Sequence, residues 1–206
     1  MSTLVDRAIG DAGLAEVLAA RRAGTLGDTE AARLRRADLL ALGALADRVR
    51  AEEVGDEVIV DTHAGEEEPA GGAGGGHSAD GPIVLPPPGR ELTGLELLRE
   101  VAVARVLGPR AARVRVDWTR CGLELAQVAL GFGASELAGR IADKRGLPLA
   151  EGQTLGVLGK KSRLEPADLV KRRELEGFVR RAGRTPRFDD ASESTAAATT
   201  PEEATP

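Results

Sequence analysis

The chain has 206 residues, 30% of them charged and 42% hydrophobic, a composition compatible with a folded domain of modest size. Its single cysteine, Cys121, excludes an internal disulfide framework and any metal centre that needs several cysteines from this chain. The net charge is −5, yet acids gather in two segments without Lys or Arg, 62–81 and 190–206. Elsewhere basic and acidic residues alternate, and aromatic residues are 2% of the chain, so we expect no nucleic-acid partner.

Two further features concern cellular location. No apolar run approaches the roughly 18 residues that a bilayer span requires. The N-terminus lacks the charged-then-apolar pattern of a signal peptide. We therefore expect a cytoplasmic protein without a membrane partner.

The composition changes along the chain and predicts four parts. Two segments lack apolar periodicity and are predicted to be disordered, a linker rich in Gly and Glu and a tail rich in Ser, Thr, Pro and Glu. The predicted parts are an N-terminal helical region with the first strand (1–61), the linker (62–81), a β/α segment (82–189) and the tail (190–206).

The N-terminal part is predicted to be helical up to about residue 55. Apolar residues recur at helical spacing over 34–49, interrupted by Gly43. A glycine inside a helix costs about 1 kcal/mol relative to alanine, which favours a close helix contact at Gly43. The apolar run 58–60 then predicts a short buried strand.

Strands and helices alternate beyond the linker. A strand is predicted over 83–85, ended by three prolines, and the next helix starts with Thr93 and Glu96 at capping-box spacing. Residues 134–158 leave helix and strand open. Alternation of this kind favours parallel β/α units and an α/β fold class. The remaining predicted elements are a strand over 114–118, a helix over 121–130 and a helix over 166–182.

Five stretches, in the order of the family, resemble the radical S-adenosylmethionine enzymes of menaquinone and deazaflavin biosynthesis, which include dehypoxanthine futalosine cyclase, aminofutalosine synthase and the FO synthase subunits. The most specific one is similar to the family's block "SW…G…aQ.AL.FGAND..G". The resemblance implies a TIM-type β/α barrel, and this chain is shorter than the roughly 250 residues of such a barrel. We therefore expect N-terminal helices plus an incomplete, partial TIM-type barrel. The stretches are ADLLALGALADRVR (37–50), VIVD (58–61), IVLPPPGRELTGLELLREVAVARVLG (83–108), VRVDWTRCGLELAQVALGFGASELAG (114–139) and RAGRTPRFDD (181–190).

The chain departs from the family at its cofactor motif. In the family a CxxxCxxC loop follows the first strand and holds the [4Fe–4S] cluster that binds S-adenosylmethionine. Residues 62–81 occupy that place here and contain no cysteine, so we expect neither cofactor. We predict a pseudoenzyme related to the futalosine pathway, whose partner is an intact radical enzyme homologue, a second copy through self-association, or a pathway metabolite. The alternative is an enzyme or enzyme subunit of that pathway that contributes substrate-binding residues.

The candidate substrate-binding residues follow two predicted strands. Gly133, Ser135 and Glu136 would lie at the carboxyl end of a strand, where β/α enzymes bind ligands, and the alternative is a glycine-bounded turn. The resemblance places Ser135 and Glu136 where the family has Asn and Asp. Asp117 and Trp118 end the predicted strand 114–118 at the same edge. A tryptophan can stack on a flat heterocycle, although packing in the core is the alternative for the one Trp of this chain.

Other motifs carry weaker predictions, and we assign neither catalytic nor metal-binding residues. Cys121 is either a thiol activated by a helix N-terminus or a buried, inert one. His63 and His77, near Glu66–Glu68, match no standard metal-site spacing, and 156–162 fails the phosphate-loop pattern. The last predicted helix has either a solvated basic face or a docking face for an acidic partner, formed by Lys171, Arg172, Arg173, Arg180 and Arg181.

Overall fold

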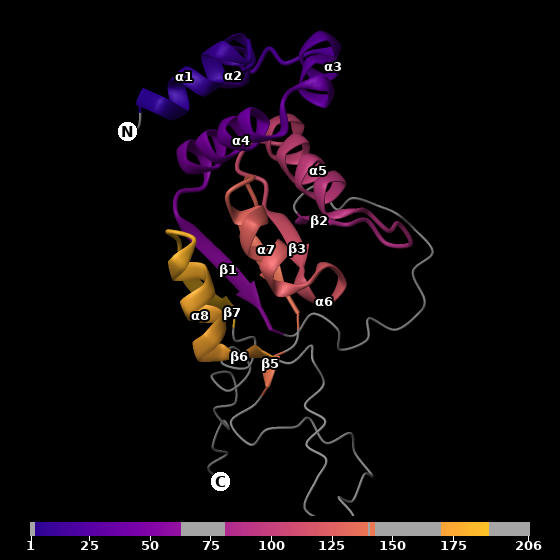
Figure 1. The fold of residues 1–206 in the computed structure, drawn as a ribbon, viewed down its shortest axis with the longest axis vertical. Helices are drawn as coiled ribbons and strands as arrows, with labels where there is room; N and C mark the ends of the chain where they lie inside the picture. Colours follow the sequence, from indigo (N-terminus) through magenta and orange to yellow (C-terminus); the bar gives the residue numbers. More distant parts are fainter. Residues whose placement is uncertain (1–2, 63–80, 140, 143–169, 190–206) are drawn as a thin grey trace, which may run out of the picture.

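The computed structural model describes residues 3–62, 81–139, 141–142 and 170–189. The N-terminal part is helical, as predicted. Three of its helices lie together at one end of the molecule, and the fourth lies between them and the sheet (Figure 1). The helices are α1 (Thr3–Asp11), α2 (Ala15–Ala23), α3 (Asp28–Arg36) and α4 (Leu39–Glu53).

Helix α4 connects the helical part to the sheet. It begins at Asp38, whose Oδ1 accepts hydrogen bonds from the backbone N–H groups of Leu40 and Ala41, both at 3.0 Å. The close contact predicted at Gly43 is present, because a Cβ there would lie 2.7 Å from Cε1 of the Phe132 ring. The glycine therefore admits an aromatic ring from the turn before residue 136 rather than a neighbouring helix backbone.

The β/α segment supplies the central strands and the helices that cover them. Its longest helix has the predicted capping box, in which the Thr93 N–H donates to Glu96 Oε2 at 2.9 Å. Strand β1 (Glu57–Asp61) ends the N-terminal part, and the first elements of the β/α segment are β2 (Ile83–Leu85), α5 (Gly94–Leu107), β3 (Val114–Asp117), α6 (Trp118–Cys121), α7 (Leu123–Leu130), β4 (Glu136–Ala138) and β5 (Ile141–Ala142). None of the helices in the described part of the chain is long and apolar enough to cross a membrane.

Three boundaries differ from the sequence prediction. Trp118 starts α6 instead of ending the strand, because Asp117 caps that helical turn. Gly122, with φ of +85°, separates α6 from α7 where one helix was predicted over 121–130. The helix predicted from 166 is wrong at Val170 and Lys171, which pair with β5 as a strand; residues 166–169 lie outside the described part. The C-terminal elements are β6 (Val170–Lys171), α8 (Arg172–Arg181) and β7 (Thr185–Asp189).

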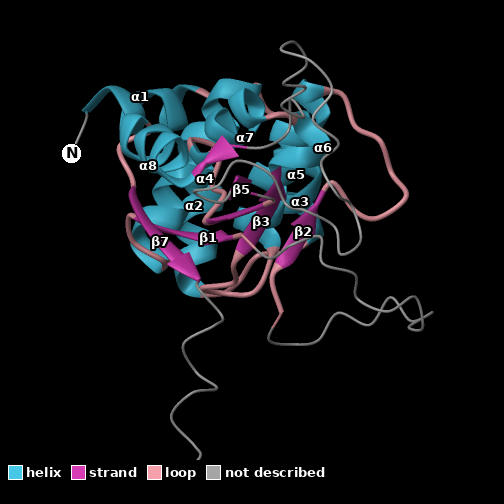
Figure 2. Ribbon diagram, turned by 90° about the horizontal axis from the view of Figure 1, so that it is seen from below, coloured by secondary structure: helices cyan, strands magenta, loops and turns pink. Residues whose placement is uncertain are grey.

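The main sheet has five strands in the order β2-β3-β4-β1-β7, and every pairing is parallel. Strands β2 and β3 lie side by side, as do β1 and β7 (Figures 1 and 2), and β4 lies between β3 and β1. A parallel sheet whose strands alternate with helices along the chain is consistent with a partial α/β barrel. The predicted α/β class is confirmed. Strand β7, which no sequence pattern predicted, pairs with the other side of β1.

The two faces of this sheet differ in polarity. Side chains alternate along each strand, and register places laterally paired residues of parallel strands on the same face. The apolar face joins one core cluster with the buried side chains of α5, α7 and α8. It is formed by Val58, Val60, Val114, Val116 and Leu137. The opposite face carries charged side chains and forms the site described next.

Candidate functional site

The charged side chains of the sheet come from three neighbouring strands. Arg115 on β3 is paired in register with Glu136 on β4, and Asp61 on β1 is in register with Ala138 on β4. The alternation of side chains therefore places Arg115, Glu136 and Asp61 on one face, which we call the polar layer. None of these positions interrupts the buried valines of the other face, because buried valines occupy every second position of β1 and β3.

Arg115 holds the polar layer together. Its Nε donates to Glu136 Oε1 at 2.5 Å, and its Nη2 contacts the same oxygen and lies 3.0 Å from Asp61 Oδ2. The Glu136 side chain is fully buried, while those of Arg115 and Asp61 are 23% and 20% exposed. A carboxylate removed from water persists only with a charged or hydrogen-bonding partner, so Arg115 is what allows Glu136 to lie in the sheet.

Two buried polar atoms near this layer accept or donate no hydrogen bond. One is Glu136 Oε2, whose nearest cation is the Arg113 Nε at 3.4 Å. The other is the indole Nε1 of Trp118, which follows β3 directly. Such atoms forgo the interactions they would make with water, which is unfavourable by about 1–3 kcal/mol each. The polar face therefore retains hydrogen-bonding capacity that the described residues do not use.

Asp117 and Trp118 lie at the carboxyl end of β3, as predicted. The Asp117 carboxylate is engaged locally, since its Oδ1 accepts from the Thr119 N–H at 2.8 Å and from the Thr119 hydroxyl at 2.6 Å. The Trp118 side chain lies in the core and is 3% exposed. Its ring packs on Gly139, where a Cβ would lie 2.2 Å from Cε2. The ring thus has the packing role that was the alternative to stacking on a ligand.

The prediction that Gly133, Ser135 and Glu136 lie at the carboxyl end of a strand is wrong. Gly133 and Ser135 precede β4 and Glu136 is its first residue, so all three lie at the amino end of that strand. There the Arg105 guanidinium donates to the Gly133 carbonyl and to the Ser135 hydroxyl, both at 2.8 Å. Ser135 Oγ also accepts from the Val114 N–H at 3.2 Å. These residues fix the start of β4, and of the predicted trio only Glu136 contributes to the polar face.

Cys121 has the properties of an inert thiol. It ends the single turn of α6 rather than starting a helix, and its Sγ donates to the Asp117 carbonyl at 3.3 Å. Burial raises the pKa of the Cys121 thiol to about 11, and the negative charge of Asp117 raises it further. The thiol is therefore protonated at neutral pH, whereas a nucleophile or a metal ligand needs to be a thiolate.

The donor set of this chain does not fit the cluster of the family it resembles. That cluster needs three thiolates, whereas the chain has one cysteine, whose raised pKa disfavours the thiolate. Within 3–62, 81–139, 141–142 and 170–189, no group of three or more His, Cys, Asp or Glu side chains is arranged to hold a metal ion. His63, His77, Glu66–Glu68 and residues 156–162 lie outside the described part.

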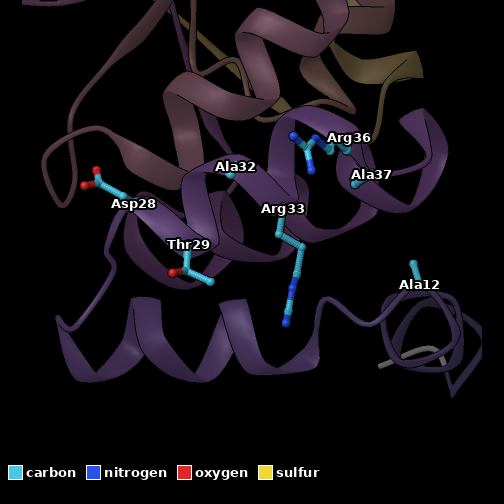
Figure 3. A pocket seen from close by; sticks show the side chains of 7 residues that line it. All are labelled: Ala12, Asp28, Thr29, Ala32, Arg33, Arg36 and Ala37. Atoms are coloured by element: carbon cyan, nitrogen blue, oxygen red, sulfur yellow. The ribbon is translucent and has the colours of Figure 1, made fainter.

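A hollow on the surface lies among the N-terminal helices, away from the polar layer. Figure 3 shows its lining, in which the Arg33 side chain extends between α3 and the segment after α1. Arg33 is already paired with Glu16, Nη1 to Oε2 at 2.6 Å. The lining residues are Ala12, Asp28, Thr29, Ala32, Arg33, Arg36 and Ala37. This surface lacks buried unpaired groups, so the polar layer is the stronger candidate site.

A parallel sheet covered by helices defines the α/β class of proteins, and comparison with known proteins narrows that class. No family model matches the chain. It is 34% identical over 95 residues to 5-amino-6-(D-ribitylamino)uracil--L-tyrosine 4-hydroxyphenyl transferase 2 of Methanosarcina barkeri, covering 46% of this chain and 22% of that protein. It is 31% identical over 127 residues to aminodeoxyfutalosine synthase of Thermus thermophilus, covering 57% of this chain and 31% of that protein.

Both relatives are radical S-adenosylmethionine enzymes, which confirms the resemblance stated from the sequence. The chain spans between about a fifth and a third of the length of these relatives. The similarity is therefore one of partial coverage, and it relates this chain to the enzymes of menaquinone and FO biosynthesis without transferring their activity.

Proposed function

We propose that this chain is a non-catalytic relative of the radical enzymes of menaquinone and deazaflavin biosynthesis, which acts by binding an intact homologue or a pathway metabolite. The polar layer of Asp61, Arg115 and Glu136 is the observation that carries the binding role. Asp61 is the last residue of β1, so it lies at the carboxyl end of its strand, where β/α barrels bind their ligands. The unpartnered Oε2 of Glu136 adds an acceptor that a bound polar group would satisfy.

The donor set supports a role without radical chemistry. One protonated thiol does not replace three thiolates, so the chain's own residues provide no ligands for the family's cluster. Arg115 remains able to orient a polar ligand, because a planar guanidinium offers several donors in a fixed geometry. The function proposed here is recognition, with Arg115 as its organising residue.

The edges of the sheet support the other form of the proposed binding role, in which the partner is a protein. Among the described strands, β2 and β7 each have one neighbour, so each has a row of backbone groups on its outer side. Proteins ordinarily cover such edges or pair them. An intact homologue or a second copy of this chain would supply that cover.

The test is affinity purification of the tagged chain from its native host under anaerobic conditions, followed by mass spectrometry of proteins and small molecules. We expect either a cysteine-bearing homologue with the brown colour of an iron–sulfur protein, or a retained metabolite. Asp61→Asn should lower the recovery of the bound homologue or metabolite. The matched control is Asp11→Asn, at an exposed position on α1. Recovery of the chain alone, colourless and without a small molecule, would show that the binding role is wrong.

An enzymatic role makes a different prediction at Glu136. Glu136→Gln preserves the shape of the side chain and removes its charge. Turnover of futalosine-type compounds that is present in the natural chain, lost in Glu136→Gln and retained in Asp11→Asn would replace the proposal with the enzymatic alternative. Circular dichroism on all three proteins separates loss of activity from loss of fold.

A further inference from the structure

Helix α8 has a basic outer surface. Its inner side is anchored by Leu175 and Val179, which are fully buried in the core. Two acidic residues, Glu174 and Glu176, accompany five cations on and beside the helix. We call these five the basic strip; all of them are exposed, and they are Lys171, Arg172, Arg173, Arg180 and Arg181.

Three cations of the basic strip lie at the end of α8 where they are least favourable. Lys171, Arg172 and Arg173 occupy the N-terminus, and the partial positive charge of a helix N-terminus favours anions instead. Glu174 is the acid of the first turn and lies 4.0 Å from the Lys171 ammonium. A further anionic group near this end would reduce the repulsion.

An acidic segment of the same chain starts beside this end of the helix. The Arg172 guanidinium lies 4.1 Å from the centroid of the Phe188 ring, so the N-terminus of α8 is adjacent to the carboxyl end of β7. Residue 190 follows β7 directly, and segment 190–206 carries four acids and no Lys or Arg. The four are Asp190, Glu193, Glu202 and Glu203.

The segment is long enough to follow the strip. A helix with the 10 residues of α8 is about 15 Å long. The 17 residues of 190–206 reach up to about 56 Å when extended. Because the segment is attached next to the strip, its effective concentration there is in the millimolar range, about that of other short tethers. Charge pairs that are individually weak can therefore hold it.

We propose that the acidic segment 190–206 binds the basic strip of α8 within the same chain. The contact neutralises the cations at the helix N-terminus and lies next to β7, an edge strand of the described sheet. The proposal is independent of the polar layer, which lies on the opposite face of the sheet.

The experiment uses the full chain with a spin label at Ala197→Cys in a Cys121→Ser background, and ¹⁵N amide spectra. At about 10 mM salt, where the screening length is about 30 Å, we expect the label to broaden the amide signals of 172–181. At about 1 M salt, where it is about 3 Å, the broadening should be lost. Unchanged α8 signals at low salt would overturn the proposal.

Matched charge variants separate a specific contact from a general charge effect. Replacing Asp190, Glu193, Glu202 and Glu203 by their amides should abolish the broadening. The control replaces Glu66, Glu67, Glu68 and Asp80 by the corresponding amides. This variant changes the net charge by the same amount and should preserve the broadening. Equal loss in both variants would refute the contact. A second control mixes spin-labelled chains of natural isotope content with ¹⁵N chains that carry no spin label. Broadening in this mixture would show that the segment binds a second copy, and it would also refute the contact within one chain.

Discussion

Two arginines that contact the sheet, Arg105 on α5 and Arg115 on β3, differ in their hydrogen-bonding partners. Arg105 lies at the amino end and is 1% exposed; it donates to the carbonyls of Ala112 and Gly133 and to the Ser135 hydroxyl. Burial lowers the pKa of Arg105 to about 10. Arg115 instead contacts two carboxylates, one of which keeps an oxygen without a hydrogen bond. The amino end is thus fixed by satisfied hydrogen bonds, whereas the polar layer keeps one buried carboxylate oxygen, Glu136 Oε2, without a hydrogen bond.

The largest expected effect comes from breaking the polar layer on one side. Arg115→Met leaves Glu136 buried without its main partner, so we expect the free energy of unfolding to fall by about 3–5 kcal/mol. The double variant Arg115→Met with Glu136→Leu removes both charges and should recover most of that loss. Urea denaturation of the three proteins measures this. Equal destabilisation in the single and double variants would show that the two side chains do not depend on each other.

Removal of the Arg105 side chain should lower the free energy of unfolding by nearly as much, and a second substitution should not compensate for it. Arg105→Ala leaves a cavity and two unsatisfied main-chain carbonyls, and we expect a loss of about 3 kcal/mol in urea denaturation. No second side-chain replacement removes those carbonyls. Arg173→Ala, on the exposed surface of α8, is the control and should change stability by less than about 0.5 kcal/mol. A loss of that small size for Arg105→Ala would contradict its role at the amino end.

The burial of Cys121, in the helical turn that follows β3, is tested by the reactivity of its thiol. Because burial raises the pKa of its thiol to about 11, the thiolate fraction at pH 8 is about 100-fold below that of an exposed cysteine. We expect its reaction with a disulfide reagent to be slower by about that factor in the folded protein and normal in urea. Fast labelling of the folded chain would revive the prediction of an activated thiol.

The smallest effect concerns a contact between the N-terminal helices. The Arg22 hydrogen bond to Glu52, aided by Arg48, lowers the pKa of Glu52 from 4.5 to about 2. The stabilisation is therefore fully present above pH 4.5 and is lost as the pH falls toward about 2. Glu52→Gln should flatten the pH dependence of stability in that window and change it by less than about 1 kcal/mol at pH 7, since Arg22 is half exposed.

A second variant checks the cause of this pH dependence. Arg22→Gln removes the main donor and keeps the Glu52 carboxylate, so it should flatten the same part of the curve. Thermal unfolding at a series of pH values between about 2 and 5 provides the measurement. An unchanged curve in Arg22→Gln would mean that another partner sets the pKa of Glu52.

The elements that sequence reasoning placed correctly are those with local causes. The capping box of Thr93 and Glu96 and the prolines after β2 act within a few residues, so the start of α5 and the end of β2 could be predicted. Strand β4 lies in a stretch where helix and strand were left open, and β7 was missed, because both gain their hydrogen bonds from strands far away in the sequence. Glu136 was singled out, but its partner Arg115 was not, although charged residues alternating with valines in β3 were a visible signal.

The sequence by itself determined the α/β class, the helical N-terminal part, the resemblance to radical enzymes and the lack of thiols for their cluster, since all of these depend on residue types and local order. The tertiary structure alone decided that Gly133 and Ser135 lie at the amino end and that Asp61, Arg115 and Glu136 form one layer. The physical reason is that strand register sets which side chains share a face, and register depends on hydrogen bonds between distant segments.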